Sequence, residues 1–270
     1  MIPAPFDYIQ AESARHAIVL LAEHGDDAKL LAGGHSLLPM MKLRLAAPEL
    51  LIDIARVPQL AGITRDGDEL VIGATTRHAD LAGSDLVREQ APLLAHAASL
   101  VGDPQIRHRG TIGGSLAHAD PAADLPMALV ALGGSMQLSG PDGTRTVAAD
   151  DFFTGFFETA LEAGELLTAV RVPCRPGAAW GYQKFVRRAN DWAIVGVAAI
   201  GGRIALANMG PVPLRARAAE EALAAGATAA DAALLAAQGT SPGEDIHADR
   251  AYREHLARVL TRRALDGEHS

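Results

Sequence analysis

Apolar positions over the first 56 residues alternate between the spacing of a helix and that of short buried strands. Residues 12–24 place apolar side chains on one helical face, at Ala14, Ala17, Ile18, Leu21 and Ala22. Gly25 follows as a predicted C-cap. Short apolar runs predict strands at residues 28–32 and 50–54. Between them, residues 36–45 predict a helix that its first residue, a serine, can cap.

Hairpins and further helices are predicted up to residue 173. Turn residues between short apolar runs predict two hairpins, which pair residues 62–64 with 69–73 and residues 136–139 with 145–148. Helical spacing predicts helices at residues 77–81, 91–100 and 124–132. The polar and basic residues 102–110 are interpreted as a loop.

A boundary is predicted at residues 173–177, where two prolines and a glycine interrupt regular structure. Beyond it, apolar runs predict a three-stranded antiparallel sheet at residues 180–186, 194–200 and 203–208. Alanine-rich stretches predict helices at residues 214–225, 229–237 and 249–265. We therefore predict two domains, residues 1–173 and 178–270, and divide the first into subdomains of approximately 1–56 and 57–173.

Composition narrows the class of protein. The 270 residues carry a formal net charge of −8, which argues against nucleic acid or an anionic membrane as the main partner. The sequence has no run of 18 apolar residues, so we expect a cytoplasmic protein without a transmembrane segment. Cys174 is the only cysteine, which excludes an intramolecular disulfide and any four-cysteine iron–sulfur or zinc site in this chain.

Two glycine-rich turns carry the strongest chemical signal. Residues 32–36 (AGGHS) and 111–115 (TIGGS) each precede a predicted helix, so each can direct backbone N–H groups at an anion. Paired glycines allow positive φ and remove the Cβ that would keep a phosphate away. A single turn of this kind can also be interpreted as a turn with a helix N-cap that binds no ligand. Two of them predict two clamps on one diphosphate, such as that of a dinucleotide.

Other chemistries find less support. The sequence lacks the P-loop, the GxSxG elbow, the HExxH helix and a GxGxxG turn that opens a βαβ unit. His118, Asp120 and Asp124 invite a metal-site interpretation, but their spacing fits no recognised zinc pattern and Pro121 interrupts them. We therefore predict no metal site.

Several stretches together resemble a known family. They are residues 32–45, 72–76 (IGATT), 111–126, 152–157 (FFTGFF) and 165–173. The chain resembles the FAD-binding subunits of molybdenum hydroxylases, which are the medium subunits of aerobic carbon monoxide dehydrogenase and its relatives and the equivalent of the flavin domain of xanthine dehydrogenase. The resemblance runs from Pro5 to about the last predicted helix.

The resemblance implies a fold, a function and partners. The fold would be α+β, with a two-subdomain FAD-binding domain of the vanillyl-alcohol-oxidase (PCMH) type and a C-terminal domain of three antiparallel strands with helices. The function would be electron transfer from [2Fe–2S] clusters of a small subunit, through FAD, to an external acceptor. A large subunit would hold the molybdopterin centre, in a dimer of heterotrimers. No residue of this chain need act as acid or base on the substrate, whose identity stays open, as does that of the acceptor.

Two alternatives remain, namely a self-contained flavin-dependent oxidase or reductase of the same fold and a non-catalytic flavin-binding assembly protein. In either case the resemblance assigns FAD contacts to the two turns, Ala32, Gly33, Gly34, His35 and Ser36 with Thr111, Ile112, Gly113, Gly114 and Ser115. It adds Val101, Asp124, Leu166, Lys184 and Trp192.

The added residues each keep a second interpretation. Asp124 would accept hydrogen bonds from the cofactor, or only begin a helix. Lys184 would stabilise a negatively charged reduced flavin, or be a solvated strand lysine. Trp192 would stack on the isoalloxazine ring, or pack in the core. The basic residues 105–109 would dock an acidic surface of the iron–sulfur subunit, or only be a solvated loop.

Overall fold

The N-terminal region is a small parallel sheet covered by a helix. The structure is a computed structural model and describes residues 2–270. Strands β1 (Asp7–Gln10), β3 (Leu50–Asp53) and β2 (Ala28–Leu31) pair in that order, and all pairs are parallel. Helix α1 (Ala14–His24) connects β1 to β2. It begins after Ser13, whose side chain caps it, and ends at Gly25, which has φ 53°. The predicted elements of this region are confirmed to within two residues, apart from the next helix.

Helix α2 (Leu37–Lys42) is shorter than predicted. The sequence suggested a helix to Leu45, but Arg44 has φ 59°, which breaks the helical path. The Ser36 side chain makes no capping hydrogen bond within residues 2–270. A short 3₁₀ turn (Gly25–Asp27) precedes β2, and another (Pro58–Leu60) follows β3.

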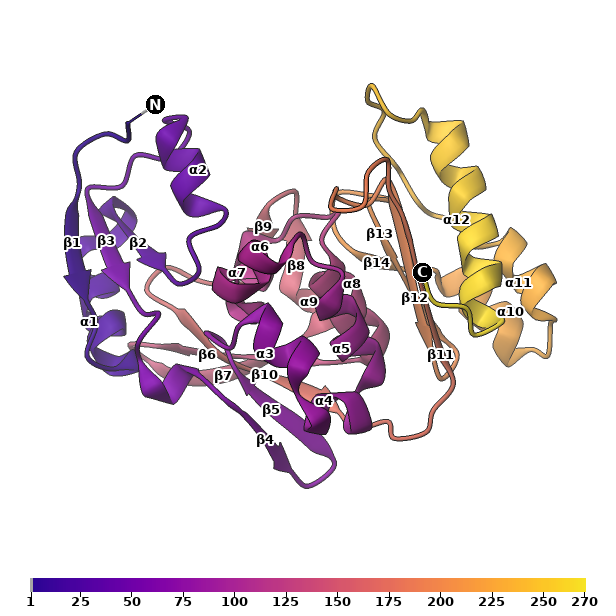
Figure 1. Cartoon of the computed structure of the whole chain (residues 1–270), viewed down its shortest axis with the longest axis horizontal. Helices are drawn as coiled ribbons and strands as arrows, with labels where there is room; N and C mark the ends of the chain where they lie inside the picture. Colours follow the sequence, from indigo (N-terminus) through magenta and orange to yellow (C-terminus); the bar gives the residue numbers. More distant parts are fainter. Residues whose placement is uncertain (1) are drawn as a thin grey trace.

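The central region is a five-stranded antiparallel sheet with helices above it (Figure 1). Its strands, in spatial order, are β4 (Ile63–Asp66), β5 (Glu69–Gly73), β10 (Leu166–Pro173), β6 (Ser135–Gly140) and β7 (Gly143–Ala148). Both predicted hairpins are confirmed. A separate two-stranded ribbon is formed by β8 (Phe153–Gly155) and β9 (Glu158–Thr159).

The helices of this region are mostly short. They are α3 (His78–Gly83), α4 (Asp85–Gln90), α5 (Pro92–Ser99), α6 (Pro104–Arg109), α7 (Ile112–His118), α8 (Asp124–Leu132) and α9 (Ala149–Phe152). Helix α4 was not predicted. The interpretation of residues 102–110 as a loop was wrong over α6, because Asp103 accepts a hydrogen bond from the Ile106 amide and Pro104 begins the helix.

Helix α8 is the centre of the core. All nine of its residues are buried, since it packs on α5 on one side and on the C-terminal sheet on the other. A helix that is apolar all round is expected for such a position. Within residues 2–270, no helix is both long and apolar enough to cross a membrane.

The C-terminal region is an antiparallel sheet with helices on the face away from α8 (Figure 1). Its strands are β11 (Trp180–Phe185), β12 (Val195–Ile200), β13 (Arg203–Ala207) and β14 (Leu214–Arg215). Its helices are α10 (Arg217–Ala224), α11 (Ala229–Leu234) and α12 (Arg250–Leu265). The prediction of three strands was wrong, because residues 214–215, assigned to a helix, pair with β13 instead.

Candidate functional site

The first glycine turn follows β2 and offers free hydrogen-bond donors. Gly34 has φ 79°, a conformation that L side chains rarely adopt. The backbone N–H groups of Gly33, Gly34, His35 and Ser36 have no hydrogen-bond acceptor within residues 2–270. Four consecutive unpaired N–H groups on a turn before a helix form the arrangement that binds anionic oxygens in proteins.

The two glycine turns are joined by a close backbone contact. A Cβ at Gly33 would collide with the Arg109 carbonyl oxygen and would lie 2.8 Å from the Cα of Gly110. Gly110 is followed directly by the second turn. The absence of a side chain at Gly33 therefore allows the segments that carry the two turns to meet.

The second glycine turn is the first turn of helix α7. Gly113 and Gly114 have helical rather than positive φ, so the positive φ that a glycine pair allows is not used here. The reason for glycine at position 113 is close packing, because its Cβ would lie 2.6 Å from the Ala74 Cβ and 2.7 Å from the Ala74 oxygen. At Gly114 the nearest atom to such a Cβ is Thr111 Oγ1, at 2.8 Å.

The N–H groups of residues 112–115 in this second turn are already paired within the protein. Ile112 donates to the Thr76 carbonyl at 3.0 Å, and Gly113 donates to the Ala74 carbonyl at 2.8 Å. Thr111, the N-cap, accepts from the Gly114 amide through Oγ1 at 3.1 Å and from the Ser115 amide through its carbonyl at 3.0 Å. What remains for a ligand is the exposed surface at Gly114 and the half-buried Ser115 hydroxyl.

A buried histidine backs the second turn. The His78 amide donates to the Gly110 carbonyl at 3.0 Å, and a Cβ at Gly110 would lie 2.8 Å from His78 Nε2. Burial, with smaller contributions from the nearby His35 and Arg107, lowers the pKa of His78 to about 4. The ring is therefore neutral at pH 7, and its Nδ1 has no hydrogen-bond partner within residues 2–270.

A second group of polar side chains lies between α8 and β11. Asp124, at the start of α8, accepts a hydrogen bond from Tyr182 and forms an ion pair of 2.8 Å with Lys184. The Lys184 ammonium also donates to the Leu100 carbonyl at 3.1 Å. Val101 is the next residue, and its carbonyl accepts from Arg107 at 3.2 Å. This group thus joins three elements that the sequence separates widely.

Comparison with known proteins decides the family. The family "FAD binding domain in molybdopterin dehydrogenase" matches residues 4–175, and "CO dehydrogenase flavoprotein C-terminal domain" matches residues 180–267. The carbon monoxide dehydrogenase medium chain of Hydrogenophaga pseudoflava is 45% identical over 280 residues, with 98% of each chain covered. The chain belongs to the FAD-binding medium subunits of carbon monoxide dehydrogenase-like molybdenum hydroxylases.

Solved structures agree with this assignment. The medium subunit is similar to a chain of carbon monoxide dehydrogenase from H. pseudoflava, described as lacking the Mo-pyranopterin moiety of the molybdenum cofactor, with a TM-score of 0.95, 47% identity and 99% and 98% of the two chains covered. It is also similar to a chain of quinoline 2-oxidoreductase from Pseudomonas putida 86, with a TM-score of 0.92, 36% identity and coverage of 98% and 97%. The medium subunit is therefore a flavoprotein subunit of an oxidoreductase, as the sequence predicted.

The structure removes some of the alternatives for individual residues of the medium subunit. The lysine at position 184 is not solvated, because its side chain is only 7% exposed and is ion-paired. Trp192 is not in the core, because it is 57% exposed. Leu166 is 1% exposed and packs in the core, so its side chain is closed to a ligand and only its main chain remains for the predicted contact.

For Asp124 the structure bears on both interpretations, a helix start and a contact with the cofactor. It begins α8, as the helix-start interpretation requires, but it is only 5% exposed and both carboxylate oxygens have partners. Burial raises its pKa, although Lys184 and Tyr182 act in the opposite direction. Its contact with FAD stays a prediction.

Two polar residues of these groups were missed from the sequence. Tyr182 and His78 are both fully or nearly fully buried. Tyr182 could have been inferred from its position two residues before Lys184, since alternate residues of a strand share a face. For His78 we find no signal in the sequence, because its burial depends on Gly110, 32 residues later.

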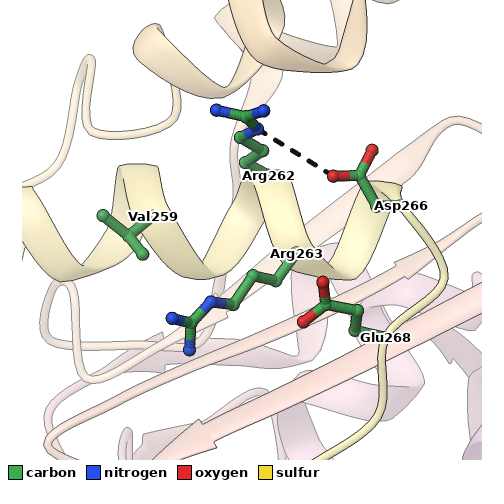
Figure 2. A pocket seen from close by; sticks show the side chains of 5 residues that line it. All are labelled: Val259, Arg262, Arg263, Asp266 and Glu268. Carbon is green, nitrogen blue, oxygen red and sulfur yellow. Dashed lines mark ion pairs between the residues drawn. The ribbon is translucent and has the colours of Figure 1, made fainter.

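Other candidate sites lie elsewhere. A shallow pocket at the end of α12 is lined by Val259, Arg262, Arg263, Asp266 and Glu268 (Figure 2), with the Arg262–Asp266 pair at 3.9 Å. It contains none of the predicted FAD residues. Within residues 2–270, no three His, Cys, Asp or Glu side chains gather in a way that would hold a metal ion.

Proposed function

We propose that this medium subunit holds one FAD with its diphosphate on the first glycine turn. The observation that carries the proposal is the set of four unpaired N–H groups at residues 33–36. Because a Cβ would obstruct Gly33 and strain Gly34, the turn needs both glycines to present these donors. The residues present therefore fit a diphosphate.

We infer different roles for the other predicted contacts. Ser115 offers a hydroxyl and Gly114 an open surface beside the first turn, which suits the ribitol or the second phosphate. Lys184, held by Asp124 and Leu100, places a buried positive charge where it would favour negative charge on the ring system. The exposed Trp192 is free to stack on the ring. Bound FAD would supply the redox chemistry, by accepting electrons and passing them on.

We further propose that the electrons come from [2Fe–2S] clusters of a small subunit, with the molybdopterin centre on a large subunit. The similarity to medium chains of carbon monoxide dehydrogenase supports separate cofactor-bearing chains. The single cysteine supports it as well, since this chain cannot ligate a cluster through four cysteines. A dimer of heterotrimers, a PCMH-type first domain at residues 1–173 and a second domain at 178–270 belong to the same proposal.

The basic segment before the second turn suits the docking of the small subunit, with one change from the sequence-based expectation. Arg107 donates to the carbonyls of Val101 and Gly102, at 3.2 and 3.1 Å, so it holds its own loop. His108 and Arg109 are exposed. We therefore assign docking to His108 and Arg109 alone.

Stopped-flow flavin reduction tests the proposed function. The complex reconstituted from the medium subunit with its large and small subunits is mixed with its substrate, and the isolated medium subunit is the parallel sample. We expect rapid bleaching of the flavin in the complex and none in the isolated subunit. Reduction of the isolated subunit at the full rate would show a self-contained flavoenzyme, and a flavin that neither sample reduces would show an assembly protein.

A charge-reversal variant tests the docking surface separately. Arg109→Glu should weaken assembly with the small subunit and slow flavin reduction in the complex, while FAD content stays the same. Arg15→Glu, at an exposed position of α1, changes the net charge by the same amount and is the control. Equal assembly of both variants would contradict the docking role of this segment and leave FAD binding unaffected.

A further inference from the structure

Tyr182 is a fully buried polar side chain for which the proposed function has no role. It lies on β11 in the C-terminal region, and its phenol donates a hydrogen bond of 2.5 Å to Asp124 Oδ1 at the start of α8. Burial and the neighbouring carboxylate raise its pKa well above the usual value, so the phenol keeps its proton and acts only as a donor towards Asp124.

The other carboxylate oxygen of Asp124 receives a second residue of the same strand. Lys184 lies two positions after Tyr182, hence on the same face of β11, and donates to Asp124 Oδ2 at 2.8 Å. Tyr182 thus binds one oxygen of the Asp124 carboxylate and Lys184 binds the other, and the two hydrogen bonds together fix the orientation of the carboxylate. The Leu100 carbonyl, at 3.1 Å, is a further acceptor for the Lys184 ammonium. An ammonium has three donors, so one donor of Lys184 remains for a ligand.

We propose that Tyr182 is a positioning residue, which fixes the Asp124 carboxylate against the Lys184 ammonium and so sets where that cation is presented to the flavin. The last step of this inference rests on the proposed role of Lys184 towards FAD. The first step concerns only the medium subunit, because all the contacts lie within one chain. Tyr182 itself need not touch the cofactor.

The physical effect of the phenol is on the ionised form of Asp124. A hydrogen bond to a carboxylate stabilises its charge, and the ionised carboxylate in turn holds the ammonium. Without Tyr182, the Asp124 carboxylate would lose one of the donors that stabilise its charge, so Asp124 would take up a proton at higher pH. A protonated Asp124 binds Lys184 far less well, and the cation would lose its fixed position.

Other charged or titratable groups on the elements around Asp124 contribute to the pH dependence of this region. They include His96 on α5, His118 on α7, Asp120 just before α8, Asp150 on α9, Arg171 on β10, Arg203 on β13, Arg215 on β14 and His269, whose backbone pairs with Tyr182. The His96 ring lies 5.3 Å from the Tyr182 ring, and burial lowers its pKa. A titration that follows the Asp124 carboxyl itself separates its protonation from theirs.

The first experiment uses the full chain without FAD. Asp residues labelled with ¹³C at the side-chain carboxyl are titrated by NMR, and the Asp124 signal is the one that Asp124→Asn removes. We expect Tyr182→Phe to raise the midpoint of that signal by about one to two pH units, the effect of losing a hydrogen bond to a charged group. An unchanged midpoint overturns the inference, whatever the function of the subunit.

Two further variants guard against a trivial result. Replacement of Tyr182 by 3-fluorotyrosine keeps the ring in place and makes the phenol a stronger donor, so the Asp124 midpoint should fall instead of rise. Tyr8→Phe removes a hydrogen bond of the same length, to Asp53, on the exposed part of the N-terminal region. It should leave the Asp124 midpoint unchanged. A shift in the same direction for Phe and fluorotyrosine would indicate general loosening and overturn the inference.

The second experiment adds FAD and measures the flavin midpoint potential against pH. Protonation of Asp124 changes the charge beside Lys184, so the plot should bend at the midpoint found by NMR, and the bend should move with it in both Tyr182 variants. Asp124→Asn should remove the bend. If the carboxyl titration moves and the bend is absent, Tyr182 still positions Asp124, and the proposed role of Lys184 towards FAD is wrong.

Discussion

The two glycine turns share a Gly-Gly pair but differ in the hydrogen bonding and backbone conformation of that pair. At residues 33–36 the N–H groups are unpaired and Gly34 has φ 79°, whereas at residues 112–115 the N–H groups are paired and the glycines are helical. The first turn needs glycine to present donors. The second needs it mainly because the Ala74 backbone approaches Gly113. A Gly-Gly pair in a sequence therefore identifies a crowded or unusual backbone, and only its surroundings tell which.

Because of this difference, we expect the two turns to contribute unequally to the binding of an anion. Consecutive free N–H groups favour an anion at the first turn, without rearrangement of the protein. At the second turn an anion would compete with Ala74, Thr76 and Thr111 for the same donors. In the proposed site the second turn would therefore contribute a packed surface and the Ser115 hydroxyl. The close approach of Gly33 to Gly110 brings the two turns together.

The largest effect is expected from a side chain at the packed glycine. Gly113→Val would place its Cβ within 2.7 Å of the Ala74 oxygen, which belongs to the backbone and cannot rotate away. We expect a loss of about 3 kcal/mol in the free energy of unfolding, the upper part of the range for overpacking, measured by urea denaturation. Gly114→Ala, whose Cβ meets only a side-chain oxygen, is the control. Equal losses for both would contradict the distinction drawn for the second turn.

A pH effect of similar size is expected from the buried histidine behind the second turn. The folded pKa of His78, about 4, lies below the usual 6.5, so only the unfolded chain takes up the proton between these values. Stability is therefore greatest above pH 6.5 and falls as pH decreases to 4, by roughly 3 kcal/mol for this group.

Comparison with His78→Gln isolates this term from the other acids and bases. The variant carries no titrating group at the position, so its free energy of unfolding should fall less than that of the wild type between pH 7 and pH 4, as followed by urea denaturation. Parallel curves for the two proteins would show that His78 gains its proton without cost to the fold.

Local patterns were sufficient for much of the fold. The prediction of a helix at residues 124–132 is confirmed in both of its bounds, and Gly133, in the left-handed conformation, ends the helix. Residues 214–215 were misassigned because they form a strand only through pairing with β13. The helix at residues 104–109 was missed because its basic residues suggested a solvated loop, and the cap at Asp103 was overlooked.

The candidate site was predictable to a smaller extent. Sequence and resemblance together named both turns, Asp124 and Lys184, but the partners of these residues come from distant segments. The Asp124–Lys184 pair spans 60 positions, and the acceptors that occupy the second turn lie near residue 75. No local pattern predicts such contacts. The sequence and the resemblance therefore name candidate residues, and the structure separates the N–H donors that are free from those that are already paired.

The first turn should respond through FAD affinity more than through stability. Gly34→Val forces an unfavourable φ, and its Cβ would lie 2.9 Å from the flexible end of Leu38, which can move. Loss of two charge-assisted hydrogen bonds, at about 1.5–3 kcal/mol each, should weaken FAD binding at least about a hundredfold by isothermal titration calorimetry. Gly25→Val, with φ 53° and open space around it, carries similar strain far from the turn and should bind FAD normally. A folded Gly34→Val protein with stoichiometric flavin would contradict the role of this turn.

The smallest effects compare the two hydroxyl residues at the starts of the helices. Thr111 accepts a capping hydrogen bond from the Gly114 amide at 3.1 Å, so Thr111→Ala should lower the free energy of unfolding by about 1 kcal/mol. Ser36 makes no such bond within residues 2–270, so Ser36→Ala should lower it by less than about 0.5 kcal/mol.

FAD titration of the same two variants should give the reverse order. Ser36→Ala keeps the backbone N–H of the proposed diphosphate site but removes the Ser36 hydroxyl, which makes no capping bond in the described part of the chain and is free to donate to a phosphate. Binding should weaken by roughly five- to tenfold, as expected for one hydrogen bond of about 1 kcal/mol. Thr111→Ala would remove the acceptor of the Gly114 N–H, which could then donate to the cofactor. This new donor should compensate for part of the FAD affinity that is lost because the start of α7 is less ordered. If Thr111→Ala instead reduces FAD affinity more than Ser36→Ala does, the second turn binds the diphosphate through its own donors. The unequal division of work between the two turns would then be wrong.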